Sequence, residues 1–136
     1  LLPQLEMADE INQRRRELWQ MYFDLLSDLA DSGRIELPYV PKECCHNAHM
    51  FYIKTRDLNE RTLLIQYLEE HQIKAVFHYV PLHSSKAGKK YGEFVGEDNY
   101  TTKESEKIVR LPMYYSLKNT EVAYVTDKII RFYKGK

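Results

Sequence analysis

The chain has 136 residues, of which 43% are hydrophobic and 29% are charged, a composition that suits one globular domain with its own core. Its 20 basic residues balance 20 acidic ones, so the long-range attraction that drives nucleic-acid binding is missing. No apolar run approaches the roughly 18 residues that a membrane span needs. We therefore predict neither a nucleic-acid partner nor a membrane partner.

The two cysteines, Cys44 and Cys45, are neighbours, which disfavours a disulfide between them and gives no spacing for a metal site. Reduced thiols, and no segment resembling a signal peptide, predict a cytoplasmic protein. The chain begins at Leu1 rather than methionine and enters a helical pattern at once. We therefore expect a fragment of something longer.

The first quarter of the chain shows a helical pattern. From Leu2 to Leu29, apolar residues recur at spacings of three and four, which predicts one long amphipathic helix. A single small sheet cannot cover its whole length, so one part of the apolar stripe is expected to face a partner domain. Gly33 is the natural left-handed cap, and a connector bracketed by Pro38 and Pro41 follows.

A β-α-β unit is predicted next. Residues 47–54 are rich in aromatic and large apolar side chains, as is typical of a strand. Asp57 or Asn59 can cap the helix that follows, whose apolar stripe runs through Glu70. Residues 75–80 then form a strand that is apolar on both faces, which we expect to lie inside the domain. The two strands would run parallel if they are neighbours.

The next segment, residues 84–99, has no period and several glycines, so it predicts a loop or a loop with a helical turn. Thr101 and Glu104 match a capping box, which predicts a short helix from residue 102 to about 109.

Residues 110–115 contain Pro112, so they are predicted to form an edge strand at best. Asn119 or Thr120 opens a last amphipathic helix. This order of elements predicts an α+β fold in which helices cover a small mixed β-sheet.

The end of the second predicted strand carries unusual polar side chains. Pro81 has no amide hydrogen, so the strand should end there and leave His83 on a loop just beyond it. His78 and Tyr79 precede the proline, and strand alternation sends them to opposite faces, so they should not both touch one ligand unless the strand twists or ends there. From the residues alone, the commoner explanation is a histidine and a tyrosine that satisfy each other or the backbone, and a ligand site is the alternative.

Other chemistry finds little support. The five histidines include no pair with the i, i+4 spacing of a zinc-binding helix, so no metal site is predicted. Phosphate-binding glycine motifs and a nucleophile elbow are missing from the sequence. Cys44 lies near His46, but nothing marks that thiol as activated.

Several segments, in their order and spacing, resemble the carboxy-terminal domain of the DegT/DnrJ/EryC1/StrS sugar aminotransferases. They are residues 47–53, 77–83, 92–94, 96–98, 100–106 and 110–112. The resemblance covers nearly the whole chain. It implies that residues 1–136 are the small domain of a fold-type-I pyridoxal-phosphate enzyme, with residues 1–30 a long helix linking to a missing amino-terminal large domain.

This resemblance implies transfer of an amino group from glutamate to the C4 ketone of a dTDP-linked 4-keto-6-deoxy sugar, for enterobacterial common antigen or another surface polysaccharide. It also implies a homodimer whose missing large domain binds pyridoxal phosphate. No lysine here lies in the family's Schiff-base motif, so we expect the fragment alone to bind no cofactor, to hold no catalytic residue and to be inactive. By the same resemblance, His78, Tyr79 and His83 line the sugar-nucleotide pocket.

The rival hypothesis is a free-standing, non-enzymatic α+β module whose apolar helix stripe docks a partner. A native gene that begins near Leu1 would favour the module. An upstream reading frame that encodes a large cofactor-binding domain would favour the enzyme.

Overall fold

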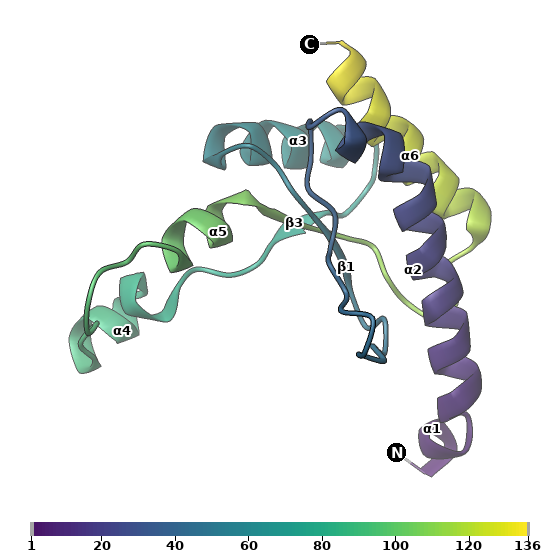
Figure 1. Ribbon diagram of the computed structural model, residues 1–136, viewed down its shortest axis with the longest axis horizontal. Helices are drawn as coiled ribbons and strands as arrows, with labels where there is room; N and C mark the ends of the chain where they lie inside the picture. Colours follow the sequence, from purple (N-terminus) through teal and green to yellow (C-terminus); the bar gives the residue numbers. More distant parts are fainter. Residues whose placement is uncertain (1, 136) are drawn as a thin grey trace.

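A three-stranded sheet lies at the centre of the molecule, and the helices surround it (Figure 1). The computed structural model describes residues 2–135, so Leu1 and Lys136, at the ends of the predicted domain, lie outside the described residues. The helices are α1 (Leu2–Glu6), α2 (Ala8–Asp31), α3 (Leu58–Glu70), the 3-10 helix η1 (Leu82–Ser84), α4 (Lys86–Tyr91), α5 (Thr101–Lys107) and α6 (Asn119–Lys134). The strands are β1 (Phe51–Lys54), β2 (Val76–Phe77) and β3 (Ile108–Leu111). The predicted α+β class is confirmed.

The strand order is β1-β3-β2, and both pairings are antiparallel. Phe51 lies opposite Leu111, and Val76 lies opposite Arg110. The prediction of a mixed sheet is corrected, because β3 inserts between the two strands of the β-α-β unit. They run in the same direction without being neighbours.

The central position of β3 corrects a second prediction. The segment around Pro112 was expected at a sheet edge, yet β3 is the middle strand and buries Val109 and Leu111. The proline follows the last paired residue, so it removes no hydrogen bond from either ladder.

The segment 75–80 is not an interior strand. Only Val76 and Phe77 pair, and they are 39% and 47% exposed at the edge of the sheet. The β-branched and aromatic side chains of this segment fit a pleated surface, but such residues do not by themselves show burial. The prediction that this strand lies inside the domain was therefore wrong.

The long amino-terminal helix is present, with a break at Met7 between α1 and α2. Gly33 has a φ of +72°, its amide donates to Ala30 O at 2.8 Å, and the amide of Arg34 donates to Leu29 O at 3.2 Å. This hydrogen-bond pattern is the Schellman motif, so the predicted glycine cap is confirmed.

The core lies where α2, α3 and α6 meet β1 and β3. Tyr22 of α2 stacks on Phe51 of β1 with ring centroids 5.0 Å apart, and its hydroxyl donates to Pro112 O at 3.0 Å. The largest fully buried side chains are Tyr22, Phe51, Leu18, Leu26, Ile53, Leu64, Leu68, Leu117 and Ile129. Truncating Phe51 to alanine would cost roughly 3–5 kcal/mol by the usual cost of an aromatic core deletion.

Of the three helix starts predicted for α3, α5 and α6, those of α3 and α6 agree with the structure. Asp57 caps α3 by accepting from the Glu60 amide at 2.8 Å, and α6 begins at Asn119. The capping box predicted at Thr101 is absent, because α5 already begins at Thr101, its N-cap residue Tyr100 makes no side-chain hydrogen bond to the helix, and Glu104 turns toward Lys54 instead.

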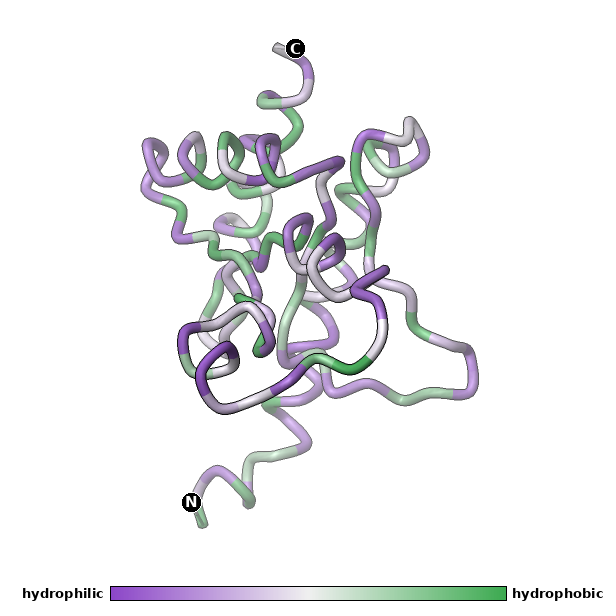
Figure 2. The backbone as a smooth tube through the Cα atoms, turned by 90° about the vertical axis from the view of Figure 1, so that its left-hand side faces the viewer, coloured by the Kyte–Doolittle hydropathy of each residue, from purple (hydrophilic) through white to green (hydrophobic). Residues whose placement is uncertain are grey.

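The segment from η1 through α4 to α5 extends away from α2 and α6 as an arm (Figure 1). Neither α4 nor α5 contains a buried residue. Figure 2 views the molecule from the side of this arm and shows hydrophobic and hydrophilic stretches interspersed along it. Among residues 2–135, no helix is both long and apolar enough to cross a bilayer.

Candidate functional site

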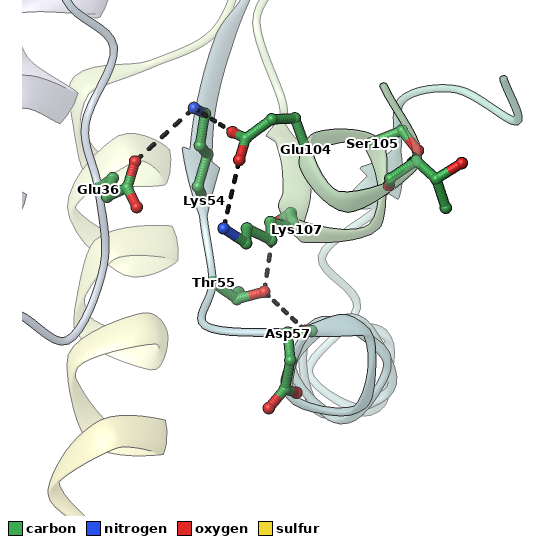
Figure 3. A network of polar contacts seen from close by, with 8 residues as sticks. Glu36, Lys54, Thr55, Asp57, Glu104, Ser105 and Lys107 are labelled. Atoms are coloured by element: carbon green, nitrogen blue, oxygen red, sulfur yellow. Dashed lines mark hydrogen bonds and ion pairs between the residues drawn. The ribbon is translucent and has the colours of Figure 1, made fainter. Parts of the chain in front are cut away.

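The arm is tied to the sheet by an ion-pair network (Figure 3). Lys54 Nζ of β1 lies 2.5 Å from Glu104 Oε2 of α5, and Lys107 Nζ lies 3.3 Å from Glu104 Oε1. Glu36 adds a longer contact to Lys54 at 3.7 Å. The hydrogen bond between Lys54 and Glu104 is the main cause that raises the pKa of Lys54 and lowers the pKa of Glu104. The network therefore holds α5 against β1.

His83 lies in η1, just past Pro81, as the proline predicted. Its Nε2 lies 2.9 Å from Asp98 Oδ2, and its ring contacts the Phe94 ring at a centroid distance of 4.4 Å. The side chains of His83 and Asp98 are 20% and 26% exposed. This imidazole is thus held in place from two sides while part of it stays open to solvent.

Asp98 is itself fixed by the first turn of α5. The Thr102 amide donates to Oδ1 at 3.1 Å, and the Thr102 hydroxyl makes a short hydrogen bond to Oδ2. These two hydrogen bonds from Thr102, and to a smaller extent the one with His83, hold the pKa of Asp98 below its usual range. The carboxylate is therefore ionised at neutral pH and can only accept hydrogen bonds.

A cavity of about 520 Å³ lies beside His83, between η1, α4 and the start of α5. It is lined by Leu82, His83, Ala87, Gly88, Tyr91, Gly92, Glu93, Phe94 and Thr101. This apolar and aromatic wall with few polar groups is the kind of surface on which a small ligand packs. His78 and Tyr79 are not among its lining residues.

His78 and Tyr79 lie together rather than on opposite faces. Their ring centroids are 3.6 Å apart, with 32° between the planes. Strand alternation does not apply because β2 ends at Phe77. The strand ends before His78, which is the condition under which alternation places no limit on the two side chains, so both can lie on one side.

His78 has a second partner in Arg110 of the central strand. Arg110 Nη1 lies 3.2 Å from His78 Nδ1, and a guanidinium can only donate, so Nδ1 accepts. Burial lowers the pKa of His78, and the charges of Arg110 and His49 lower it further. The ring is therefore neutral, with its proton on Nε2.

Sequence reasoning missed Asp98, Phe94 and Arg110 as neighbours of the predicted site residues. Asp98 and Phe94 lie in the aperiodic stretch 84–99, where no spacing indicates which side chains meet. The only sequence signal for these residues was that Phe94, Asp98 and Arg110 each lie in a segment that resembles the aminotransferases.

Lys54 and Lys107, the two lysines of the ion-pair network, do not suit a Schiff base with pyridoxal phosphate. Such a lysine must lose its proton, whereas Lys54 and Lys107 both pair with Glu104. Within residues 2–135, no group of three histidine, cysteine, aspartate or glutamate side chains could hold a metal ion. Cys44 and Cys45 are free and exposed.

Comparison with known families gives one clear match. The model of the DegT/DnrJ/EryC1/StrS aminotransferase family matches residues 1–130. Among curated proteins, the chain is 29% identical over 130 residues to dTDP-3-amino-3,6-dideoxy-alpha-D-galactopyranose transaminase of Aneurinibacillus thermoaerophilus, covering 94% of this chain and 33% of that protein. It is 27% identical over 135 residues to GDP-perosamine synthase of Escherichia coli O157:H7, covering 99% and 35%. The chain thus spans about a third of the length of these relatives.

Solved structures share the fold. The crystal structure of S. venezuelae DesV in complex with a ketimine intermediate superposes with a TM-score of 0.83 at 25% identity, covering 94% of this chain and 33% of that one. Helicobacter pylori PseC, an aminotransferase involved in the biosynthesis of pseudoaminic acid, gives a TM-score of 0.85 at 16% identity, covering 99% and 36%. At that lower identity the likeness concerns the fold alone.

Proposed function

We propose that this chain, which belongs to the DegT/DnrJ/EryC1/StrS aminotransferase family, is the carboxy-terminal domain of a nucleotide-sugar aminotransferase. The family match over residues 1–130 carries the proposal, and the chain's length, about a third of its relatives, supports it. The family match favours this function over a free-standing, non-enzymatic module.

The proposed reaction transfers an amino group from glutamate to the C4 ketone of a dTDP-linked 4-keto-6-deoxy sugar. The product would serve enterobacterial common antigen or another surface polysaccharide. Pyridoxal phosphate, bound by an amino-terminal large domain, would supply the electron sink for this chemistry. The present chain would hold no catalytic residue and bind no cofactor alone.

In the full-length protein, His78, Tyr79 and His83 would form one wall of the sugar-nucleotide pocket. The cavity beside His83 supports the role of His83 because it offers apolar and aromatic packing next to an oriented imidazole. His78 and Tyr79 stack on each other and expose a tyrosine ring at the sheet edge. We further propose a cytoplasmic homodimer, which the free and exposed Cys44 and Cys45 suit.

The test replaces His83 with alanine in the full-length protein. Loss of one hydrogen bond and its ring contact should raise KM for the sugar nucleotide about 10-fold, since the two together contribute roughly 1.4 kcal/mol, which corresponds to about tenfold. The absorbance of bound pyridoxal phosphate should not change. His71→Ala is a matched control, because His71 ends α3 and its Nδ1 contacts Tyr67 O at 2.8 Å, away from the arm. Loss of cofactor absorbance in His83→Ala, or an unchanged KM, would refute a substrate role for His83.

A further inference from the structure

Asp98 joins His83 to the first turn of α5 through both of its oxygens. Oδ1 accepts from the Thr102 amide at 3.1 Å, and Oδ2 accepts from the Thr102 hydroxyl and lies 2.9 Å from His83 Nε2. Because Thr102 makes two contacts, the carboxylate cannot turn away from the imidazole without losing both hydrogen bonds to the first turn of α5. The ion pair between Glu104 and Lys54 anchors this helix to the sheet in turn (Figure 3).

The same contacts determine which nitrogen of His83 carries the proton. An ionised carboxylate offers lone pairs and no hydrogen, so Nε2 must be the donor in its contact with Asp98. Among the described residues, Nδ1 of His83 has no hydrogen-bond partner. The Phe94 ring, 4.4 Å away, restricts rotation of the imidazole. Nδ1 is thus the nitrogen left for a ligand.

We infer that Asp98 is a positioning residue that holds His83 in the Nε2–H tautomer and leaves Nδ1 to the ligand. In the neutral ring, Nδ1 accepts a hydrogen bond from a hydroxyl group of the sugar nucleotide. Asp98 acts only through His83. The inference rests on the proposed role of His83 in sugar-nucleotide binding.

The variant Asp98→Asn in the full-length protein tests this role. The side-chain amide keeps an oxygen for the Thr102 amide and presents an NH₂ group to His83, so Nε2 must become the acceptor and the proton must move to Nδ1. The histidine tautomer is read from nitrogen-15 chemical shifts after selective histidine labelling, with the His83 signal assigned by its loss in His83→Gln. We expect the tautomer to switch, KM for the sugar nucleotide to rise about 10-fold, and kcat and cofactor absorbance to stay near the wild-type values.

Two further variants separate orientation from charge and from folding. Glu97→Gln removes the neighbouring carboxylate, which accepts a hydrogen bond from Asn99 Nδ2 at 3.4 Å, and it should leave both the tautomer and KM unchanged. Thr102→Val removes the hydroxyl that holds Asp98 and that also lies 3.4 Å from His83 Nε2, while the backbone amide stays. It should raise KM about 3-fold, which gives a second test if Asp98→Asn does not fold.

The outcomes distinguish this inference from the proposed function. If His83→Ala raises KM but Asp98→Asn leaves the tautomer on Nε2, or switches the tautomer without changing KM, Asp98 does not position His83 for ligand. An equal effect of Glu97→Gln would likewise overturn the inference, because charge alone would then explain the change. If His83→Ala leaves KM unchanged, the proposed substrate role fails whatever the tautomer experiment shows.

Discussion

Breaking the Lys54–Glu104 ion pair should loosen the arm that carries the candidate site. The two variants are Lys54→Met, which keeps the length of the side chain, and Glu104→Gln, which keeps its shape. Lys54 joins β1 to α5 through a 2.5 Å contact. Neither α4 nor α5 has a buried residue, so the arm depends on this pair and on the hydrogen bonds that Thr55 and Arg61 make to the end of α5.

The size of the effect follows from the geometry. Two unit charges about 3 Å apart attract with on the order of 5 kcal/mol at an effective dielectric constant of about 20. The side chains of Lys54 and Glu104 are 25% and 38% exposed, so solvent screening, desolvation and the ordering of two long side chains offset most of that. We expect a net coupling free energy of about 1 kcal/mol.

A double-mutant cycle on the 136-residue chain measures this coupling, with urea unfolding followed by circular dichroism. The control cycle uses Arg131 and Asp127, which pair at 2.8 Å on the surface of α6 with side chains 64% and 46% exposed. Its coupling should be clearly smaller, because both partners remain in water. Equal coupling energies in the two cycles would show that the Lys54 pair does not anchor the arm.

Two further predictions concern pH and the cavity wall. Since the pKa of Glu104 is lowered from 4.5 and that of Lys54 is raised from 10.5, the stability that the pair contributes should be complete between these values. This stability should be lost as pH falls through the lowered pKa of Glu104 or rises through the raised pKa of Lys54. The measurement compares the unfolding free energies of wild type and Lys54→Met across pH. A difference between them that does not change with pH would contradict the pairing. Gly88→Ala would place a Cβ 1.7 Å from Leu82 O, so α4 must move off η1 and KM for the sugar nucleotide should rise several-fold in the full-length protein. Gly135→Ala, where the nearest atom is 3.5 Å away, should leave KM unchanged.

The features that could be predicted from the sequence are those decided by neighbouring residues. The Gly33 cap depends on one left-handed residue after a helical stripe, and the Asp57 cap depends on an amide three residues later. Pro81 likewise ends the extended segment and leaves His83 beyond it. Each rule uses residues within one helical turn.

The features that could not be predicted depend on contacts between distant segments. Glu104 had a local partner available in a capping box, but the contact with Lys54, 50 residues away, prevails. The segment around Phe77 has the composition of a core strand. However, β2 pairs with β3 on one side only, so Phe77 lies at the edge of the sheet and is partly exposed. The pairing of His83 with Asp98 spans a stretch without periodicity, so no sequence pattern indicated it.

The central claim is that this chain completes a nucleotide-sugar aminotransferase. Its most direct test incubates the full-length protein with pyridoxal phosphate, glutamate and a dTDP-linked 4-keto-6-deoxy sugar, and identifies the sugar product by mass spectrometry. We predict an amino sugar with the amino group at C4 from the full-length protein, and no product from the 136-residue chain. A full-length protein that binds the cofactor but aminates no nucleotide-linked keto sugar would contradict the account.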